Sequence, residues 1–220
     1  LWNGWTRRYG QREGLEDSTL WSVARGPDGR IWAGTNSGLS VMQGGRFEQV
    51  VAGARLPHPN AYTLLPEPGA VWIGTRRGVA VLRGDQVETP DVLAPMRSAQ
   101  INGILRDRAG ALWFATTQGL FRLSRDLLSP LGVANGFRDP RMRVLHETRD
   151  GRLLVGTQSG LYEVAGDLAT PIGLDAGLRE GLDITAIHEL DDGKLVLGTL
   201  SEEIFLFDGQ RWTTFGRDSG

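Results

Sequence analysis

The chain has 220 residues, with 24 basic and 26 acidic side chains and no cysteine. This balanced charge, without long runs of one sign, argues against nucleic acid or an anionic membrane surface as a partner. The absence of cysteine excludes disulfides and Cys-bound metal and fits either a cytoplasmic or a periplasmic location. No apolar stretch approaches the roughly 18 residues that a membrane-spanning helix needs.

Glycine is the most informative residue in the composition. The chain contains 31 glycines, roughly double the usual share of about 7%. They are spread along the whole chain, which indicates many tight turns and not a flexible linker.

One pattern recurs along the chain and predicts the fold. It first appears at 28–35 as Asp-Gly-Arg-Ile-Trp-Ala-Gly-Thr, closed by Gly-Leu at 38–39, and returns at 69–75, 110–116, 150–157 and 192–199. Its last small residue falls at Gly34, Gly74, Ala115, Gly156 and Gly198, in steps of 40, 41, 41 and 42 residues. Five copies in nearly constant register indicate five structural repeats of about 41 residues.

Each repeat is predicted to form four short strands. In the third repeat the apolar runs lie at 101–106, 112–116, 120–123 and 127–131, bounded by Gly, Asp and Gln. No segment keeps a helical period, and the apolar runs are typical of strands buried on both faces. The sequence therefore predicts an all-β, β-propeller domain over 1–220, with five four-stranded blades near 20–50, 61–90, 101–131, 142–170 and 184–215.

The residues that recur have structural explanations. Gly29 and its equivalents are expected in two-residue hairpin turns that need a positive φ angle. Trp32, Trp72 and Trp113 share one register and are expected to pack between blades. Thr35 is expected to bond the backbone at a strand end. Asp28, Asp150 and Asp192 are predicted to form turns and not a carboxylate site.

The recurring string resembles the two-component regulator propeller repeat. The segments 13–15, 135–137 and 176–178 are similar to the turn that precedes the first strand in that family, and 5–9 and 212–215 resemble its aromatic outer strand. The resemblance implies a periplasmic sensor propeller, ahead of a membrane helix and a histidine kinase, diguanylate cyclase or DNA-binding output module. Such propellers sense extracellular ligands, often glycans, or mediate dimerisation, and no cofactor is implied.

No catalytic constellation is visible in the sequence. His146 and His188 share one repeat position, ten residues before Gly156 and Gly198. We interpret this position as a core or interblade one, with no metal bound, because no carboxylate shares the register to complete a ligand set. The alternative is a propeller-type lyase or hydrolase that acts on a glycan or small molecule through one of these histidines.

A ligand is expected at the face of the blades that carries the turns between second and third strands and the loops between blades. Arginines and amides at these places suit an anionic or carbohydrate ligand. The candidate binding residues are Arg76, Arg77, Asn102, Gln118, Arg141 and Gln158.

The two aromatic outer-strand segments make a prediction about ring closure. A propeller closes when one terminus supplies a strand to the blade made by the other, so a five-bladed ring needs only one of 5–9 and 212–215. In addition, 216–220 resembles the opening of another inter-blade turn. We therefore expect the five blades to be an arc of a larger ring, seven-bladed in the parent protein, with association as a homodimer through its uncovered blades.

Overall fold

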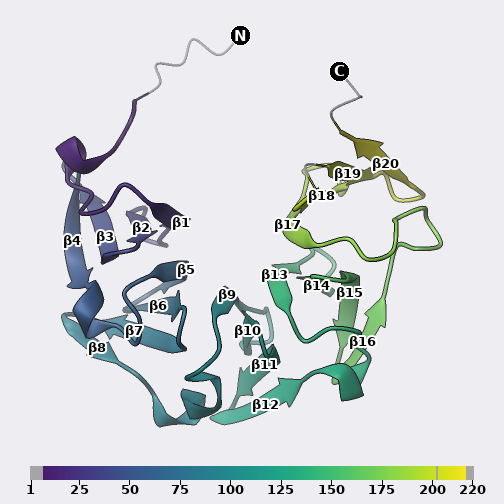
Figure 1. Cartoon of the computed structure of the whole chain (residues 1–220), viewed down its shortest axis with the longest axis horizontal. Coiled ribbons are helices and arrows are strands. Elements are labelled where there is room, and N and C mark those ends of the chain that lie inside the picture. The colour runs from purple at the N-terminus through teal and green to yellow at the C-terminus, as the bar shows by residue number, and fades with distance from the viewer. Residues whose placement is uncertain (1–6, 202, 217–220) are drawn as a thin grey trace. The chain divides into compact units, whose positions relative to one another are not determined.

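The computed structural model describes residues 7–201 and 203–216. Five four-stranded antiparallel sheets follow one another along the chain, and within each sheet every strand pairs with the next one in sequence (Figure 1). This confirms the predicted all-β fold with five four-stranded blades. The chain divides into two compact units, Leu1–Ser98 with blades 1 and 2, and Ala99–Gly220 with blades 3 to 5.

The first unit contains two blades and three short 3-10 segments. Its elements are η1 (Gln11–Glu13), β1 (Leu20–Arg25), β2 (Ile31–Thr35), β3 (Gly38–Gln43), β4 (Arg46–Ala52), η2 (Gly53–Arg55), β5 (Ala61–Glu67), β6 (Ala70–Thr75), β7 (Val79–Arg83), β8 (Gln86–Glu88) and η3 (Asp91–Met96).

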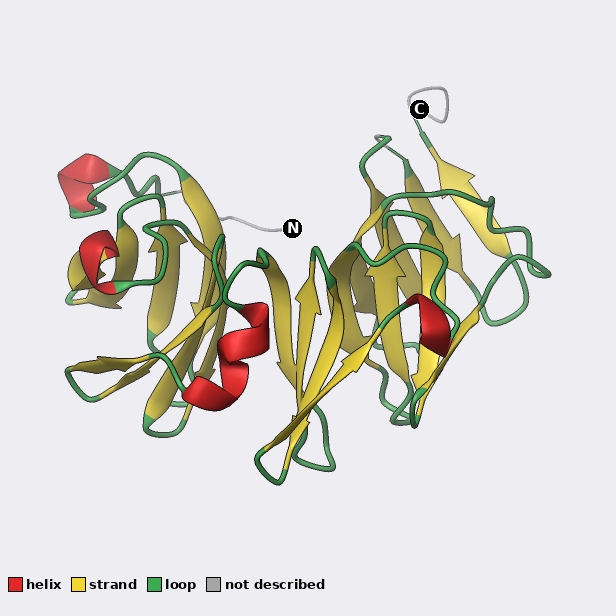
Figure 2. Cartoon of the chain, turned by 60° about the horizontal axis from the view of Figure 1, so that its bottom comes forward, coloured by secondary structure: helices red, strands yellow, loops and turns green. Residues whose placement is uncertain are grey.

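The second unit contains three blades and one 3-10 segment, and Figure 2 shows how strands dominate the described chain. Its elements are β9 (Ile101–Arg106), β10 (Leu112–Thr116), β11 (Gly119–Ser124), β12 (Leu127–Leu131), η4 (Val133–Asn135), β13 (Met142–Glu147), β14 (Leu153–Thr157), β15 (Gly160–Ala165), β16 (Leu168–Pro171), β17 (Ile184–Glu189), β18 (Leu195–Thr199), β19 (Ile204–Phe207) and β20 (Trp212–Phe215).

Apolar side chains from facing blades form the core of each unit. In the first unit Trp32 and Leu39 of blade 1 pack in one cluster with Leu64 and Ile73 of blade 2. In the second unit Trp113 of blade 3 packs in one cluster with Leu153 and Tyr162 of blade 4. The tryptophan register is therefore an interblade position, as predicted. In blade 4 the same register holds Leu154, which is fully buried.

A threonine fixes the turn between the second and third strands in blades 1 to 4. The Thr75 hydroxyl donates to the Gly78 carbonyl at 2.9 Å and accepts the Arg77 amide at 3.0 Å. Thr116 makes the same pair of bonds with Gly119 and Gln118. The repeated Thr is thus a structural bracket for the turn, which confirms its predicted role.

The turns between first and second strands are longer than expected in most blades. The predicted two-residue turn occurs in blade 2, where Glu67 pairs with Ala70. In blade 1 the turn spans five residues, closed by the bond from the Gly26 amide to the Arg30 carbonyl. Within it, the Gly29 amide donates to the Gly26 carbonyl and closes a tighter turn. Gly29 ends this tighter turn and has the expected positive φ of 81°. Asp28 accepts the Arg30 amide at 3.0 Å, as expected of a turn former.

The turn that precedes blades 1 and 4 demands glycine. Gly14 and Gly136 have φ angles of 99° and 104°, and a Cβ atom on either would lie within 2.2 Å of a backbone carbonyl oxygen of the outer strand. The next residues, Leu15 and Phe137, are buried against that blade. These are the turns whose sequence resembles the propeller-repeat family.

Two blade faces carry exposed apolar side chains. Val23 of β1 is 58% exposed, whereas Leu64 at the same register of β5 is 9% exposed. Ile204 of β19 is 51% exposed, whereas Leu161 of β15 is 2% exposed. A further blade or a second copy is expected to cover such faces, and the larger ring stays a prediction.

The aromatic outer-strand segments are described only in part. Trp212–Phe215 is the outer strand β20 of blade 5, as expected. Arg7–Tyr9 is not a strand, and the rest of the 5–9 segment lies outside the described residues, as do Glu202 and 217–220. Among the described residues, no helix is long and apolar enough to cross a membrane.

Candidate ligand-binding surface

The first strand of every blade carries a β-bulge at the same place. In β1, Leu20 pairs with Thr35 and Ser22 with Gly34, so Trp21 has no partner. An extra residue of this kind bends the strand and re-aims its side chain. The five residues at this position, called the bulge residues below, are Trp21, Tyr62, Asn102, Arg143 and Thr185.

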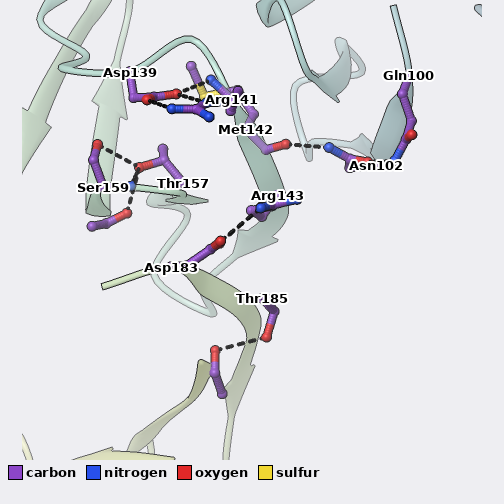
Figure 3. Close-up of polar contacts among 12 residues, drawn as sticks. Gln100, Asn102, Asp139, Arg141, Met142, Arg143, Thr157, Ser159, Asp183 and Thr185 are labelled. Carbon is purple, nitrogen blue, oxygen red and sulfur yellow. Dashed lines mark hydrogen bonds and ion pairs between the residues drawn. The ribbon is translucent and has the colours of Figure 1, made fainter. Parts of the chain in front are cut away.

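The bulge residue of blade 3, Asn102, is held by hydrogen bonds on both ends of its amide (Figure 3). Its Nδ2 donates to the Met142 carbonyl of blade 4 at 2.7 Å, and its Oδ1 accepts from Gln100 Nε2 at 2.8 Å. Gln100 is itself fixed, because its carbonyl accepts the Thr117 amide at 3.1 Å. The two amides therefore form an ordered polar pair at the start of β9.

The bulge residue of blade 4, Arg143, forms a two-bond ion pair with Asp183 of the loop before blade 5. The guanidinium donates to both carboxylate oxygens, at 2.9 and 2.8 Å. Both side chains are half-buried, with 31% of Arg143 and 15% of Asp183 exposed. Because a guanidinium has five N–H donors, this pairing fixes its plane and leaves donors for a ligand. Thr185, the bulge residue of blade 5, donates to the Gly198 carbonyl at 3.3 Å.

Arg141 lies two residues before Arg143 and pairs with Asp139. Hydrogen bonds from Arg141 hold the pKa of the Asp139 carboxyl below its ordinary value, and the same contact raises the pKa of Arg141. The backbone amide of Gln158 donates to the backbone carbonyl of Arg141 at 3.1 Å, so the predicted residues Arg141 and Gln158 lie next to each other. Asn102 joins them through the Met142 carbonyl.

The remaining predicted residues lie on turns. Gln118 follows Thr117 on the β10–β11 turn of the second unit. Arg76 and Arg77 are exposed on the β6–β7 turn of the first unit. Arg77 lines a hollow of about 320 Å³ together with Arg97, Leu93 and Pro57. The six predicted residues are thus divided between the two units, two in the first and four in the second.

The bulge, which is the position that these five residues share, was not predicted from the sequence. Of the five bulge residues only Asn102 is among the six candidates, and Asp183 was missed as the partner of Arg143. A signal for them does exist in the alignment of repeats. The residue 12 or 13 positions before Gly34 and its equivalents differs in chemistry in each blade, whereas its surroundings repeat.

The two histidines lie on neighbouring strands of the second unit, nearer the other end of the blades. His146 on β13 pairs across the sheet with Leu154, and its Nε2 is buried without a hydrogen bond, at 3.9 Å from Glu189 Oε2. His188 on β17 is exposed. The expectation of a packed position thus holds in part for His146 and is wrong for His188. The described residues contain no group of three metal-binding side chains.

We expect His146 to make the protein less stable as the pH falls below about 6.5. Burial lowers the pKa of His146 below its ordinary value of 6.5, with a nearby charge on His188 acting in the same direction, and Glu189 and Glu147 oppose this only in part. The unfolded chain therefore binds a proton at a pH where folded His146 remains neutral, so unfolding is favoured. Urea denaturation at pH 7.5 and 5.5 measures the effect.

The matched variants for this prediction come from the repeat itself. Leu65 and Leu105 fill the His146 register in blades 2 and 3, so His146→Leu is expected to reduce the loss of stability at pH 5.5. His188→Leu keeps His146 in its buried place and is expected to retain most of that loss, because burial is the main cause of the lowered pKa. An unchanged pH dependence in His146→Leu would contradict the prediction.

Comparisons with known proteins support the propeller fold. No protein-family model matches the chain, and no curated protein sequence matches it with significance. Among solved structures, the extracellular domain of the hybrid two-component system BT3049 from B. thetaiotaomicron superposes with a TM-score of 0.76 at 18% identity, over 94% of this chain and 31% of that one. The corresponding domain of BT4673 from the same organism gives 0.77 at 20% identity, over 92% and 28%.

An enzyme shares the same fold. A streptogramin B lyase superposes with a TM-score of 0.70 at 15% identity, over 92% of this chain and 70% of the lyase. The chain spans less than a third of the two sensor domains. From its repeats, its sheets and these likenesses, the chain has the β-propeller fold found in the extracellular domains of two-component sensor proteins.

Proposed function

We propose that this chain is a non-catalytic ligand-recognition propeller of an extracellular sensor, periplasmic in a bacterial signal-transduction protein. The observation that carries the proposal is the bulge position. Structural residues repeat from blade to blade, but the bulge residues are Trp, Tyr, Asn, Arg and Thr. A position that the backbone fixes and that differs in chemistry in each blade is suited to recognition and has no common structural task.

The proposed ligand of the second unit is a polar molecule with an anionic group, such as an acidic sugar. Arg143 offers a guanidinium whose orientation Asp183 has already set. Asn102 and Gln100 place amides on the neighbouring blade. Pre-oriented donors of this kind lose little conformational freedom when a ligand binds, and Arg is the side chain best suited to two-bond recognition of a carboxylate or sulfate.

The likeness to extracellular domains of two-component systems supports the sensor assignment. In such a protein the propeller binds the signal molecule, and a separate output module produces the response. Since the chain spans less than a third of these domains, the output module and the signal of the whole protein are part of the proposal.

We expect Arg143→Ala to weaken binding of an acidic oligosaccharide by about tenfold or more, because a charge-assisted hydrogen bond contributes roughly 1.5–3 kcal/mol. The experiment is calorimetric titration of the purified chain with oligogalacturonate and sulfated disaccharides. Arg143→Lys, which lacks the planar fork, is expected to recover only part of the affinity.

The control for this experiment is Arg152→Ala. Arg152 is an exposed arginine on the β13–β14 turn that pairs with Asp150 and with Glu163, and its loss is expected to leave binding unchanged. Equal weakening in both variants would show that net charge alone attracts the ligand. Turnover of a bound saccharide that depends on these residues would contradict the non-catalytic assignment.

A second candidate function is that of a lyase, and the neighbouring imidazoles favour it. His188 is exposed, His146 on the neighbouring strand lies 3.9 Å from Glu189, and a lyase shares the fold. An imidazole of this kind is suited to abstract a proton from a substrate. Release of an unsaturated product from a glycan or lactone, abolished by His188→Ala, would establish this function.

A further inference from the structure

Trp21 and Tyr62, the bulge residues of blades 1 and 2, form an aromatic pair in which Trp21 is exposed and Tyr62 is half-buried. Their ring centroids lie 4.6 Å apart, with 53° between the ring planes. The strands that carry them, β1 and β5, lie side by side in the first unit. Trp21 is 45% exposed, whereas the repeat tryptophan of the same blade, Trp32, is 6% exposed. Trp21 is therefore not a core residue of its blade.

Hydrogen bonds from neighbouring loops set the orientation of the Trp21 ring. Its Nε1 donates to Asn36 Oδ1 on the β2–β3 turn at 2.7 Å. The same oxygen accepts from Asn60 Nδ2 in the loop before blade 2. The backbone amide of Asn60 donates to His58 Nδ1 at 3.2 Å. The exposed indole is thus held in place before any ligand binds, which lowers the entropic cost of binding.

Polar groups flank the aromatic pair. Within the described chain, the Asn36 amide nitrogen and the Asn60 amide oxygen have no hydrogen-bond partner, so one donor and one acceptor lie beside the ring. Both groups are neutral. The nearby carboxylate of Asp17 already accepts bonds from Ser37 and the Thr19 amide.

We propose that Trp21 and Tyr62 form a stacking subsite for a neutral pyranose ring of an oligosaccharide. A pyranose presents a face of C–H hydrogens, which the electron-rich face of an indole attracts. Its hydroxyl groups both donate and accept hydrogen bonds, and this matches the free groups of Asn36 and Asn60. Among the contacts of this pair there is no unpaired carboxylate that would favour a cationic ligand and no basic side chain that would favour an anionic one.

The subsite deepens the proposed function, on which it rests, by naming a neutral sugar as a ligand of the first unit. The acidic ligand of Arg143 belongs to the second unit. Either ligand assignment can therefore be contradicted by experiment while the other still holds.

The test is calorimetric titration of the whole chain with neutral hexasaccharides, namely cellohexaose, xylohexaose and mannohexaose. We expect at least one to bind, with Trp21→Ala weakening it by about tenfold or more. Trp21→Tyr keeps an aromatic face and is expected to retain most of the affinity. Asn36→Ala, which releases the indole, is expected to give an intermediate loss.

Three results would overturn the subsite. One is binding of a neutral hexasaccharide that Trp21→Ala leaves unchanged. Another is failure of all three neutral sugars to bind while an acidic one binds through Arg143, which would leave the proposed function intact. The third is a concentration-dependent mass that Trp21→Ala abolishes, because a second copy would then cover the rings.

Discussion

Replacing Trp113 by Ala is expected to lower the free energy of unfolding by about 3–5 kcal/mol. Trp113 is 5% exposed and packs with Leu153, Tyr162 and other apolar residues of blade 4. Its Nε1 also donates to Asp107 Oδ2 at 2.7 Å. Truncation would leave a cavity between two blades that cannot close without moving both sheets. Chemical denaturation followed by circular dichroism measures the loss.

Two variants separate burial from the loss of an aromatic ring. Trp113→Leu introduces the residue type that blade 4 uses at this register, and it is expected to cost less than Trp113→Ala. Trp21→Ala removes an exposed indole and is expected to cost less than about 1 kcal/mol. A loss below about 1 kcal/mol for Trp113→Ala would contradict the interblade packing.

Replacing Gly34 by Ala is expected to destabilise the protein by about 1–3 kcal/mol or more, although it adds a single methyl group. A Cβ atom at Gly34 would lie 2.4 Å from the Ala61 carbonyl oxygen of blade 2 and 2.6 Å from Ser22 Oγ. The obstructing oxygen belongs to the backbone of a packed strand, so relief requires the two blades to separate. The readout is the same denaturation experiment.

The repeat supplies the control for this prediction. Gly198 holds the same register in blade 5, but its Cβ would meet only the Ala186 side chain, at 3.3 Å. Gly198→Ala is therefore expected to change stability far less than Gly34→Ala. Equal losses in the two variants would mean that backbone freedom, and not close approach of the next blade, requires glycine here.

Blade 3 shows how this register accepts a methyl group. It holds Ala115 in place of glycine, and the residue paired with it on the first strand is Gly103. In blades 1 and 4 the pairing is reversed, with Ser22 and Val144 opposite glycine. The glycine of the pair thus lies on the first strand in blade 3 and on the second strand in blades 1 and 4.

The sequence was sufficient to predict the features that every blade needs. Thr35 and Gly29 recur in all five blades and Trp32 in three, because a strand-end turn, a left-handed backbone and an interblade gap each accept few residue types. Their spacing gave the number of blades and, to within a few residues, the strands. The same logic assigned Asp28 to a turn, which its bond to the Arg30 amide confirms.

The candidate surface was predicted less well, for a physical reason. The bulge is set by backbone pairing, which accepts almost any side chain, so Trp21 and Thr185 share no motif. The Arg143–Asp183 pair joins residues 40 positions apart that meet only because two blades pack. Turn length also escaped prediction, since Gly29 fits a short or a longer turn equally well.

The bulge has a consequence for how such a protein changes over generations. One codon in each blade encodes a side chain on which little of the packed interior depends, while the codons around it are constrained by folding. Duplication or recombination of whole blades can then reshuffle these side chains without disturbing the architecture. Under the proposed function, the preference for one ligand over another can be rewritten one blade at a time.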